Sequence, residues 1–430
     1  MRIGVLSSDI SLNLEIEKEL SRFASMDMIG FYTETEQAIE FLNFEMPDIA
    51  IVNFSDQALD RRHIIEQVTA DTWLHNFGII GIFDRGVDQE KTLADSLKRL
   101  NVLNLFERGR LPGNLAKTID IIKENRQVIS QRDISDKFTD KVSGSLAIDN
   151  DVLAVPSYVN LLAICLSSRG FADDEVKTNF TIALSELILN GIEHGNCKIS
   201  YDEKKAFLDQ GRGIFELAAE KCKDPRISAK RVTLEYEILP ERSTFRVRDQ
   251  GDGFDVRNYL ASRATRDTTA LLGRGIMMAR GFAKSLTYNS KGNEATLTIE
   301  HRPTDMASPQ GFKEEEAVRF KKGDIVFRED EASTFVYYIL SGRFSVFHKK
   351  QHVGLITPAD IFMGEMSFLL DNRRSATVRA DEDGKLIRIS KKSFIKVIKR
   401  YPHYGIFLSR LIAQKLARTN AATAHYMAGA

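Results

Sequence analysis

The sequence predicts a multidomain protein in which an α/β domain, an α+β domain and a mostly-β roll with C-terminal helices follow one another. Short apolar runs alternate with helical ones over residues 1–128, helices precede strands over 150–302, and short strands separated by Gly and Asp fill 312–430. The stretches 129–149 and 303–311 are expected to be linkers. A chain of 430 residues is long enough for several domains.

The composition favours a soluble cytoplasmic protein. Lys and Arg total 60 residues, as do Asp and Glu, so binding of nucleic acid or membranes through net charge alone is not expected. Three cysteines without a CxxC motif indicate reduced thiols rather than a disulfide framework or a zinc site. The sequence shows neither a signal-peptide pattern nor the roughly 20 apolar residues that a membrane span needs.

The first region alternates strands and helices. The runs RIGVL, MIGFY, DIAIVNF, FGIIGIF and VLNLF are predicted strands, and LEIEKELSRFA, TEQAIEFLNF and GNLAKTIDIIKENRQ are predicted helices. This alternation predicts a parallel sheet covered on both faces. Together with the phrase PDIAIVNF, it resembles a response-regulator receiver domain, which has a flavodoxin-like fold.

The resemblance to receivers fails at the residues that carry their chemistry. Ser8 and Asp9 stand where receivers have a metal-binding acidic pair, and Asn53 stands at the phosphoacceptor position. The family's lysine after the fifth strand is replaced by Glu107 or Arg108. Because an amide cannot attack a phosphoryl group as a carboxylate does, we expect a docking domain that accepts no phosphate.

Two alternatives to a docking domain stay open for residues 1–128. Asp56 follows Asn53 closely and could serve as a shifted phosphoacceptor. The region could also be any flavodoxin-like domain without a ligand, because that fold hosts many unrelated functions.

The second region begins with helices, one of which carries polar residues at regular spacing. The stretch SELILNGIEHGN places Glu186, Asn190 and His194 at intervals of four, so a helix would bring them to nearly the same face. On spacing alone, a solvated helix face explains this stripe.

Two glycine-containing motifs follow the stripe. In DQGDGFD, Asp249 comes directly after a predicted strand, and Gly251 and Gly253 permit a tight turn. Gly273, Arg274 and Gly275 then open a helical run, and a glycine-flanked helix N-terminus suits phosphate groups. Each motif alone is a weak signal, but the ordered set ExxxN, DxGxG and GxG is specific.

This ordered set resembles the GHKL (Bergerat-fold) ATP-binding domain of histidine kinases, gyrase and Hsp90, and within that family the anti-sigma-factor serine kinases. The resemblance implies ATP as a cofactor, with Mg²⁺ held by Asn190 and Glu186 acting as general base on the attacking hydroxyl. It also implies that Asp249 accepts a hydrogen bond from the adenine amino group. Gly251 and Gly253 would let the backbone approach the base. His194 is expected to be structural.

The same resemblance assigns further residues around the nucleotide. Gly273 and Gly275 would bind phosphates, and Arg274 would either touch a phosphate or face solvent. Residues 256–272 would form a mobile lid, and Thr296 would lie on the strand that closes the pocket. The insertion at 202–226 is predicted to form two short helices that cover the pocket or bind a partner.

Histidine kinases and larger ATPases are the main alternatives to a kinase of the anti-sigma type. Autophosphorylation on histidine requires a His ahead of the ATP domain, and residues 129–175 contain none. Machines of the gyrase or Hsp90 kind need large transducing domains, which the sequence lacks.

The third region contains the stretch GEMSFLLDNRRSATV, which resembles the phosphate-binding cassette of cyclic-nucleotide-binding domains. Arg374 can pair bidentately with a cyclic phosphate, and Glu365 can accept a hydrogen bond from the ribose 2′-OH. Alternatively, Arg374 pairs with an acidic neighbour in a ligand-free roll. The groups that would complete the anion site are the backbone N–H groups of 365–369 and of Gly364, Ser375 and Ala376.

The C-terminal helix carries an apolar stripe that could pack on the roll or form a homodimer seam. Its members are Ile406, Phe407, Leu411, Ile412 and Leu416. No helix-turn-helix follows, so direct DNA binding is not expected.

Together these patterns predict an ATP-dependent serine/threonine kinase of the anti-sigma type whose activity or partner choice is gated by cAMP or cGMP. Its expected partners are an anti-anti-sigma-like protein, a sigma factor, or both. One alternative is a non-catalytic scaffold that responds to ATP and cyclic nucleotide. Another is a degenerate roll that serves only for dimerisation.

Overall fold

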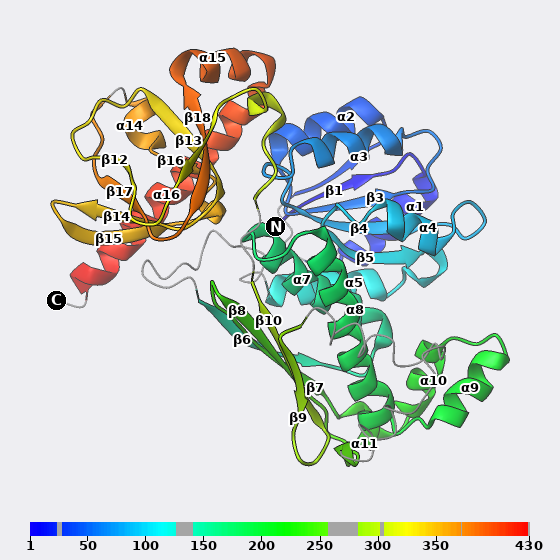
Figure 1. Ribbon diagram of the computed structural model, residues 1–430. Coiled ribbons are helices and arrows are strands. Elements are labelled where there is room, and N and C mark those ends of the chain that lie inside the picture. Colours follow the sequence, from blue (N-terminus) through cyan, green and yellow to red (C-terminus); the bar gives the residue numbers. More distant parts are fainter. Residues whose placement is uncertain (24–27, 126–140, 257–282, 302–304, 371, 429–430) are drawn as a thin grey trace.

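The computed structural model describes residues 1–23, 28–125, 141–256, 283–301, 305–370 and 372–428 (Figure 1). These residues form a parallel sheet, an antiparallel sheet and a roll of two four-stranded sheets. Within the described ranges, no helix is both long enough and apolar enough to cross a membrane.

The N-terminal domain is a five-stranded parallel sheet, as predicted, and its strand order is β2-β1-β3-β4-β5. The strands are β1 (Arg2–Leu6), β2 (Met28–Tyr32), β3 (Ile49–Asn53), β4 (Gly78–Phe83) and β5 (Val102–Glu107). Both faces are buried: Ile3 and Ile49 belong to one apolar cluster, whereas Leu6 and Ala50 belong to another. Burial on both sides explains why these strands are nearly continuous apolar runs.

Five helices accompany this sheet: α1 (Ile10–Leu20), α2 (Thr35–Glu40), α3 (Arg61–Ala70), α4 (Glu90–Ser96) and α5 (Asn114–Glu124). Helix α1 begins four residues before the predicted run at Leu14, because the Asp9 carboxylate accepts a hydrogen bond from the Leu12 N–H and caps the helix. Helix α2 continues into a π-helical turn, Phe41–Glu45.

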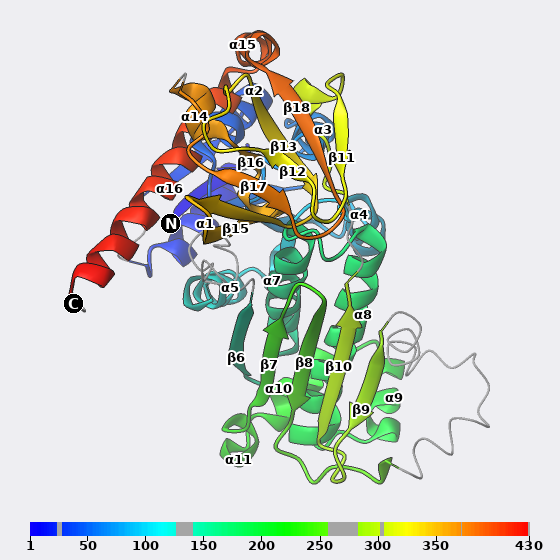
Figure 2. The same ribbon diagram turned by 60° about the vertical axis from the view of Figure 1, so that its left-hand side comes forward.

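The second domain is an antiparallel sheet with strand order β6-β7-β8-β10-β9, seen side by side in Figure 2. The strands are β6 (Val142–Ile148), β7 (Val232–Ile238), β8 (Arg242–Arg248), β9 (Ser285–Tyr288) and β10 (Glu294–Glu300). Helices α7 (Val155–Ser168) and α8 (Asp174–Asn190) supply most of the buried residues that meet the sheet.

The linker predicted at 129–149 is wrong over its last part, because residues 142–148 form β6. Val142, Leu146 and Ile148 are buried and alternate with polar or small residues, which is the pattern of a half-buried edge strand. Gly144 leaves room for the Tyr236 ring, since a Cβ there would lie 2.4 Å from the Tyr236 hydroxyl oxygen.

The insertion between the two halves of this domain forms the two short helices predicted for it. They are α9 (Tyr201–Asp209) and α10 (Ile214–Lys221), followed by one further turn, α11 (Pro225–Ser228). In Figure 1 they extend from the end of α8 that is remote from the roll.

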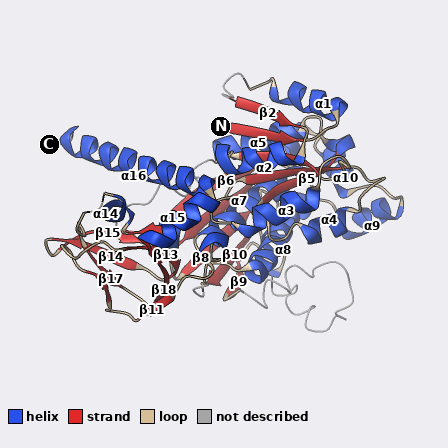
Figure 3. Cartoon of the chain, turned by 90° about the horizontal axis from the view of Figure 1, so that it is seen from above, coloured by secondary structure: helices blue, strands red, loops and turns tan. Residues whose placement is uncertain are grey.

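The roll pairs two four-stranded sheets, ordered β11-β18-β13-β16 and β12-β17-β14-β15. Its strands are β11 (Ala317–Phe320), β12 (Ile325–Phe327), β13 (Phe335–Ser341), β14 (Phe344–His348), β15 (Gln351–Ile356), β16 (Phe362–Met363), β17 (Thr377–Ala380) and β18 (Gly384–Ser390). Its helices are α14 (Glu365–Leu369), α15 (Lys391–Arg400) and the long α16 (Pro402–Ala428). Figure 3 shows α16 running out toward the C-terminus on the side of the roll.

The predicted apolar stripe of the last helix is only partly buried. Phe407 and Leu411 lie in an apolar cluster with residues of the N-terminal domain and the roll, and Ile412 packs against it. Ile406 and Leu416 are exposed. The helix therefore packs on neighbouring domains through one part of the stripe.

The N-terminal domain shares a core with the second domain. Helix α7 covers the edge strand β5, and apolar residues of both domains belong to one buried cluster. The Asn104 side-chain N–H donates to Ser157 Oγ at 2.9 Å, and the Asn160 side-chain N–H donates to the Leu103 carbonyl oxygen at 3.1 Å. These bonds satisfy polar groups that would otherwise be buried without partners.

The turn of residues 71–75, between α3 and β4, joins the N-terminal domain to the roll. Trp73 is buried among Tyr338, Phe362, Tyr404 and Phe407, which come from the roll and from α16. The Tyr404 hydroxyl and the Gln310 N–H both donate to Asp71 Oδ1, at 2.7 and 2.9 Å. The N-terminal domain thus contacts both other domains.

His75 in this turn predicts a loss of stability in acid. Burial lowers the pKa of the imidazole from 6.5 to about 4, although the nearby Asp71 carboxylate opposes the shift. Between those values the unfolded chain binds a proton that the folded chain does not, so stability falls as the pH falls. From pH 7 to pH 5 we expect the free energy of unfolding to drop by about 2 kcal/mol on this account.

Urea unfolding of the wild-type protein and the His75→Gln variant at both pH values checks this expectation. The variant should lose less stability on acidification than the wild type. An equal loss in the two proteins would show that another group is responsible.

Candidate functional site

The candidate site of the second domain is built around Asp249, which directly follows β8. Ser243, Phe245 and Val247 of β8 are buried on the helix-covered face of the sheet. Because side chains alternate along a strand, Asp249 continues this series on the same face. Its carboxylate is half-buried, and its Oδ1 accepts a hydrogen bond from the Gly251 N–H at 2.7 Å.

Three glycines let the end of α8 approach this carboxylate closely. A Cβ at Gly191 would lie 3.4 Å from the Asp249 Cβ, and a Cβ at Gly195 would lie 2.4 Å from the Asp249 Cγ. A Cβ at Gly251 would lie 2.5 Å from the Gly195 carbonyl oxygen. Side chains at Gly195 and Gly251 would therefore collide with the turn, so these positions require glycine.

Gly253 has a different requirement. Its φ is +81°, and a Cβ there would lie 2.0 Å from the Lys291 carbonyl oxygen. Phe254 N–H donates to the same carbonyl oxygen at 3.1 Å, and the Lys291 ammonium donates to the Gly251 carbonyl oxygen at 3.0 Å. The turn 249–254 is therefore fixed to the loop between β9 and β10.

The electrostatics of Asp249 suit a half-buried hydrogen-bond acceptor. Burial raises the pKa of the Asp249 carboxyl from its ordinary value, while the Gly251 N–H and the Lys291 ammonium lower it. Because Oδ1 is used by Gly251, Oδ2 is the oxygen through which this carboxylate can bind an amino group.

The predicted polar stripe on α8 is correct for two of its three members. Glu186 and Asn190 are half-buried, Asn190 being the last residue of the helix. The chain then continues as a π-helical turn, Gly191–Asn196, in which the Cys197 N–H donates to the Ile192 carbonyl oxygen. A π-helical turn breaks the four-residue spacing, so His194 leaves the stripe. His194 is exposed, and its Nδ1 lies 2.7 Å from the Ile199 carbonyl oxygen.

Two buried polar residues of this π-helical turn were not predicted from the sequence. Glu193 is 2% exposed, and its carboxylate pairs with the Lys204 ammonium of α9 at 2.5 Å. Asn196 is fully buried, and its Oδ1 accepts a hydrogen bond from the Gln250 N–H at 2.9 Å. They fix the end of α8 to the insertion and to the Asp249 turn.

Other predicted residues are not brought to Asp249. Ala295 and Leu297 are buried on the helix-covered face of β10, so Thr296 between them lies on the opposite face, where it pairs with Arg246. Gly273, Arg274, Gly275 and residues 257–272 of the proposed lid lie outside the described residues.

The described residues fit a magnesium ion that is held mainly by phosphate groups. Among them, no cluster of three or more His, Cys, Asp or Glu side chains could hold a metal ion. A Mg²⁺ ion bound through one or two protein oxygens and substrate phosphates needs no such cluster. The half-buried amide of Asn190, one residue before the π-helical turn, can supply one oxygen.

The candidate site of the roll is built around Arg374, which is 3% exposed. Its Nη1 donates to the Gly364 carbonyl oxygen at 2.9 Å and to Ser367 Oγ at 3.1 Å, and its Nη2 donates to the Phe335 carbonyl oxygen. Its Nε is buried and has no hydrogen-bond partner among the described residues. Desolvation by burial lowers the pKa of this guanidinium from its ordinary value. An unpaired buried N–H is costly, so it fits an anionic ligand.

The surroundings of Arg374 leave room for this guanidinium. Gly364 has a φ of +76°, and a Cβ there would lie 2.3 Å from Arg374 Nη1. The Phe327 ring stacks on the guanidinium, with its centroid 4.3 Å from Cζ. Ser375 is exposed and Ala376 is half-buried, directly after Arg374.

Glu365, the predicted ribose-binding residue, is 6% exposed at the start of α14. Its Oε1 accepts a hydrogen bond from the Lys415 ammonium of α16 at 2.9 Å. Glu365 is therefore not the acidic neighbour that the alternative of a ligand-free roll gives to Arg374, since it pairs with a lysine instead.

At the carboxyl end of the parallel sheet, the polar groups of the N-terminal domain bind one another. The Asn53 side-chain N–H donates to Ser7 Oγ at 3.3 Å. Arg108 Nη1 pairs with Asp9 Oδ2 at 2.6 Å, and it is Arg108 rather than Glu107 that reaches this carboxylate. Leu12 N–H and Arg108 both lower the pKa of the Asp9 carboxyl, against burial. Asp56 accepts hydrogen bonds from the Ser8 N–H at 2.5 Å and the Ser8 hydroxyl at 2.9 Å.

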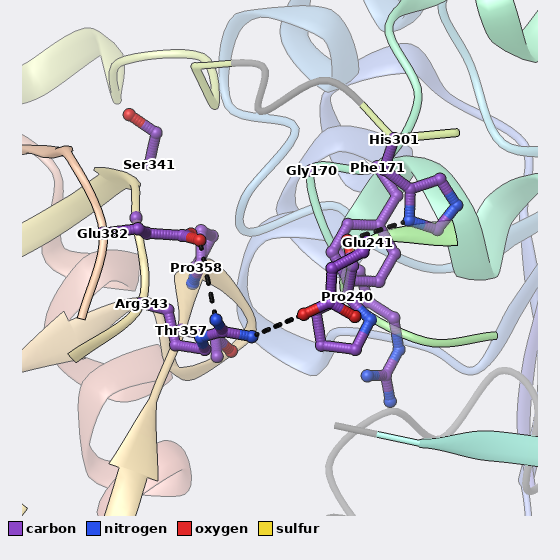
Figure 4. Close-up of a pocket in the computed structure, with 12 residues that line it drawn as sticks. Gly170, Phe171, Pro240, Glu241, His301, Ser341, Arg343, Thr357, Pro358 and Glu382 are labelled. Carbon is purple, nitrogen blue, oxygen red and sulfur yellow. Dashed lines mark hydrogen bonds and ion pairs between the residues drawn. The ribbon is translucent and has the colours of Figure 1, made fainter. Parts of the chain in front are cut away.

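A separate pocket of about 190 Å³ lies where the second domain meets the roll (Figure 4). Arg343 lies between Glu241 of the second domain and Glu382 of the roll, with N–O distances of 3.3 and 3.8 Å. The rings of Phe171 and His301 stack at 4.4 Å. None of the predicted site residues lines this pocket.

Comparisons with known families cover both candidate sites. Residues 154–299 match the Histidine kinase-like ATPase domain, and residues 317–401 match the Cyclic nucleotide-binding domain. The first match includes α8 and the Asp249 turn, and the second includes Glu365 and Arg374. The chain therefore contains one domain of each kind.

Individual relatives match only over short stretches. The Cyclic AMP receptor protein of Thermus thermophilus is 28% identical over 102 residues, which are 23% of this chain and 47% of that protein. The cGMP-dependent protein kinase of Plasmodium berghei is 31% identical over 81 residues, 19% of this chain and 9% of that protein. The solved structure of the Thermus thermophilus Catabolite Activator Protein has a TM-score of 0.26 at 22% identity, covering 27% of this chain and 57% of that one. This chain thus spans less than half the length of these two curated relatives.

Proposed function

We propose that this chain, which contains a histidine kinase-like ATPase domain and a cyclic nucleotide-binding domain, is an ATP-dependent serine/threonine kinase of the anti-sigma type. Its place is the cytoplasm, and cAMP or cGMP bound to the roll gates its activity or its choice of partner. The observation that carries the ATP site is the half-buried Asp249 carboxylate, held by the Gly251 N–H against the glycines at the end of α8.

In this proposal the residues of the second domain divide the chemistry among them. Asp249 Oδ2 accepts a hydrogen bond from the adenine amino group, while Gly251 and Gly253 let the backbone approach the base. Asn190 would hold Mg²⁺ through its amide oxygen, and the ion would supply positive charge that neutralises the phosphates. Glu186, one turn earlier on α8, takes the proton from the attacking hydroxyl.

In the roll, Arg374 binds the cyclic phosphate and Glu365 accepts a hydrogen bond from the ribose 2′-OH. The buried, unpaired Arg374 Nε supports this assignment. The protein substrate would be an anti-anti-sigma-like protein, and a sigma factor would be bound by contact alone.

The N-terminal domain would be a receiver-like docking domain that accepts no phosphate. Asn53 supplies no carboxylate at the phosphoacceptor position, and the Asp56 carboxylate is already bonded to Ser8. Asp9, which would stand in the place of one acid of a receiver's metal-binding pair, is paired with Arg108.

The ATP site is tested with an Asp249→Asn variant and thermal unfolding in Mg-ATP. An amide at this position would turn an N–H donor toward the adenine amino group, so we expect ATP affinity to fall at least about tenfold. A ligand that binds only the folded protein raises its melting temperature. Mg-ATP should therefore stabilise the wild type far more than the variant.

Asp252→Asn is the matched control for this experiment. Asp252 lies in the same turn, but it is exposed and pairs with Lys198 at the surface. This variant should respond to Mg-ATP as the wild type does. Equal stabilisation of all three proteins would remove Asp249 from the site, and no stabilisation of the wild type would contradict ATP binding.

A second candidate function is a scaffold that binds ATP without transferring its phosphate. The extensive contacts of the N-terminal domain with both other domains favour it, because they suit a protein that signals through conformation. The scaffold would regulate its partner by binding alone.

A further inference from the structure

Helix α16 connects the nucleotide site of the roll to the N-terminal domain. Near its middle, the Lys415 ammonium donates to Glu365 Oε1 at 2.9 Å and to the Phe362 carbonyl oxygen at 3.3 Å. Glu365 is almost fully buried, so this ion pair is shielded from solvent on one side. In Figure 1, α16 starts near the N-terminal domain, passes behind the strands of the roll and ends on the far side of the roll.

Nearer its start, the same helix holds the N-terminal domain. The rings of Tyr404 and Phe407 lie edge-on to Trp73, with centroids 4.8 and 4.9 Å away. The Tyr404 hydroxyl donates to Asp71 Oδ1 at 2.7 Å. Arg410 Nη1 donates to the Glu45 carbonyl oxygen at 2.8 Å. A movement of α16 would therefore directly change the surroundings of the Trp73 ring.

Phe362 belongs to both contacts. Its ring lies edge-on to Trp73 at 5.8 Å, and its backbone carbonyl accepts the hydrogen bond from Lys415. It comes two residues before Gly364, whose carbonyl oxygen binds Arg374. The nucleotide site, the Lys415 contact and the Trp73 contact are thus adjacent in one packed cluster.

We propose that Lys415 is an internal competitor of the cyclic nucleotide at Glu365, and that its displacement moves α16 against Trp73. The proposal rests on the function proposed above for Glu365. In the structure, the ammonium supplies the donor that the buried carboxylate requires. A ribose hydroxyl would replace that donor, and Lys415 would then lose its partner at this position.

In this arrangement, the N-terminal domain transmits a conformational change from the roll to the ATPase domain. The turn 71–75 packs against α16 and would move with it. The core shared by β5, α5 and α7 links the N-terminal domain to the ATPase domain. The intact Lys415–Glu365 pair lowers the apparent affinity of the wild type for the nucleotide, because part of the binding energy is used to break the pair and release the helix.

Trp73 is a direct reporter of this movement, since the sequence contains one tryptophan. The experiment compares the full-length wild type with Lys415→Met, which keeps the length of the side chain and removes its charge. Calorimetry measures the affinity for cAMP and for cGMP in separate titrations, and tryptophan emission is recorded with and without each ligand. Lys396→Met, an exposed lysine of α15, is the matched control.

We expect the nucleotide to change the Trp73 emission of the wild type. Lys415→Met should bind the same nucleotide about five- to tenfold more tightly. Its emission without ligand should already be shifted toward that of the liganded wild type. Lys396→Met should behave as the wild type in both measurements.

Unchanged or weaker binding by Lys415→Met would overturn the competition. A wild-type emission that stays constant while calorimetry shows binding would overturn the link to Trp73. If neither nucleotide binds wild type or variant, the proposed ligand of the roll is wrong. The emission of unliganded Lys415→Met then decides alone: a shift supports the link between Lys415 and Trp73, and no shift refutes it.

Discussion

Replacing Arg374 with alanine is expected to weaken cyclic nucleotide binding to the roll about 100-fold, as measured by calorimetry. The guanidinium is buried, and its Nε has no partner among the described residues, so a cyclic phosphate would gain charge-assisted bonds that alanine cannot make. Arg374→Lys should fall between the two, because an ammonium keeps the charge but lacks the planar fork.

The controls for this prediction separate binding from folding. Arg373→Ala changes the neighbouring arginine, which is exposed and donates to the Asp330 carbonyl oxygen, and it should bind nucleotide as the wild type does. Arg374 also holds the Gly364 and Phe335 carbonyl oxygens, so thermal unfolding without ligand must show that the variant is folded. Unchanged affinity in a folded Arg374→Ala protein would mean that the roll does not bind its ligand through this residue.

Replacing Glu186 with glutamine is expected to lower the rate of phosphate release from Mg-ATP at least about 100-fold. A general base that activates a hydroxyl would also activate water, so hydrolysis reports its loss without a known protein substrate. The affinity for ATP should change little, because Glu186 is not expected to contact the adenine or the ribose. Rates of inorganic phosphate release and calorimetric titration with Mg-ATP provide the two readouts.

Glu175→Gln is the control, since Glu175 is an exposed residue in the first turn of the same helix. It should hydrolyse ATP at the wild-type rate. Equal rates for wild type and Glu186→Gln would remove Glu186 from the chemistry. ATP binding without any phosphate release by the wild type would favour the scaffold over the kinase.

The central strands of the N-terminal sheet could be predicted because their burial is uniform along each strand. Strands β1, β3 and β4 are covered on both faces, so each reads as an almost unbroken apolar run. Strand β6 was missed because only alternate residues are buried and the others are polar or small. Because so many residues of 142–148 are polar or small, the alternation of buried and exposed positions is hard to recognise in the sequence.

Site residues that lie in one short motif could be predicted from the sequence. Site residues whose position depends on the local backbone geometry could not. Asp249 and its glycines form one tight turn, whereas the π-helical turn at Gly191–Asn196 changes the helical period and removes His194 from the stripe. Thr296 lies on the predicted strand, β10, but the buried Ala295 and Leu297 on either side carry a period-two signal that puts its side chain on the face opposite theirs.

The contacts between domains could not be predicted from the sequence. The Lys415–Glu365 pair joins residues 50 positions apart, and the Tyr404–Asp71 bond joins residues 333 positions apart. Their partners are specified by how whole domains pack, and no local pattern around Lys415 or Trp73 identifies them.

The most direct test of the account is a calorimetric titration of the full-length chain with Mg-ATP, without and with saturating cAMP or cGMP. The account predicts that ATP binds and that one cyclic nucleotide changes its dissociation constant at least about fivefold, because two sites that share a conformational equilibrium must influence each other. An ATP affinity that is the same with and without a bound cyclic nucleotide would contradict coupling between the two domains.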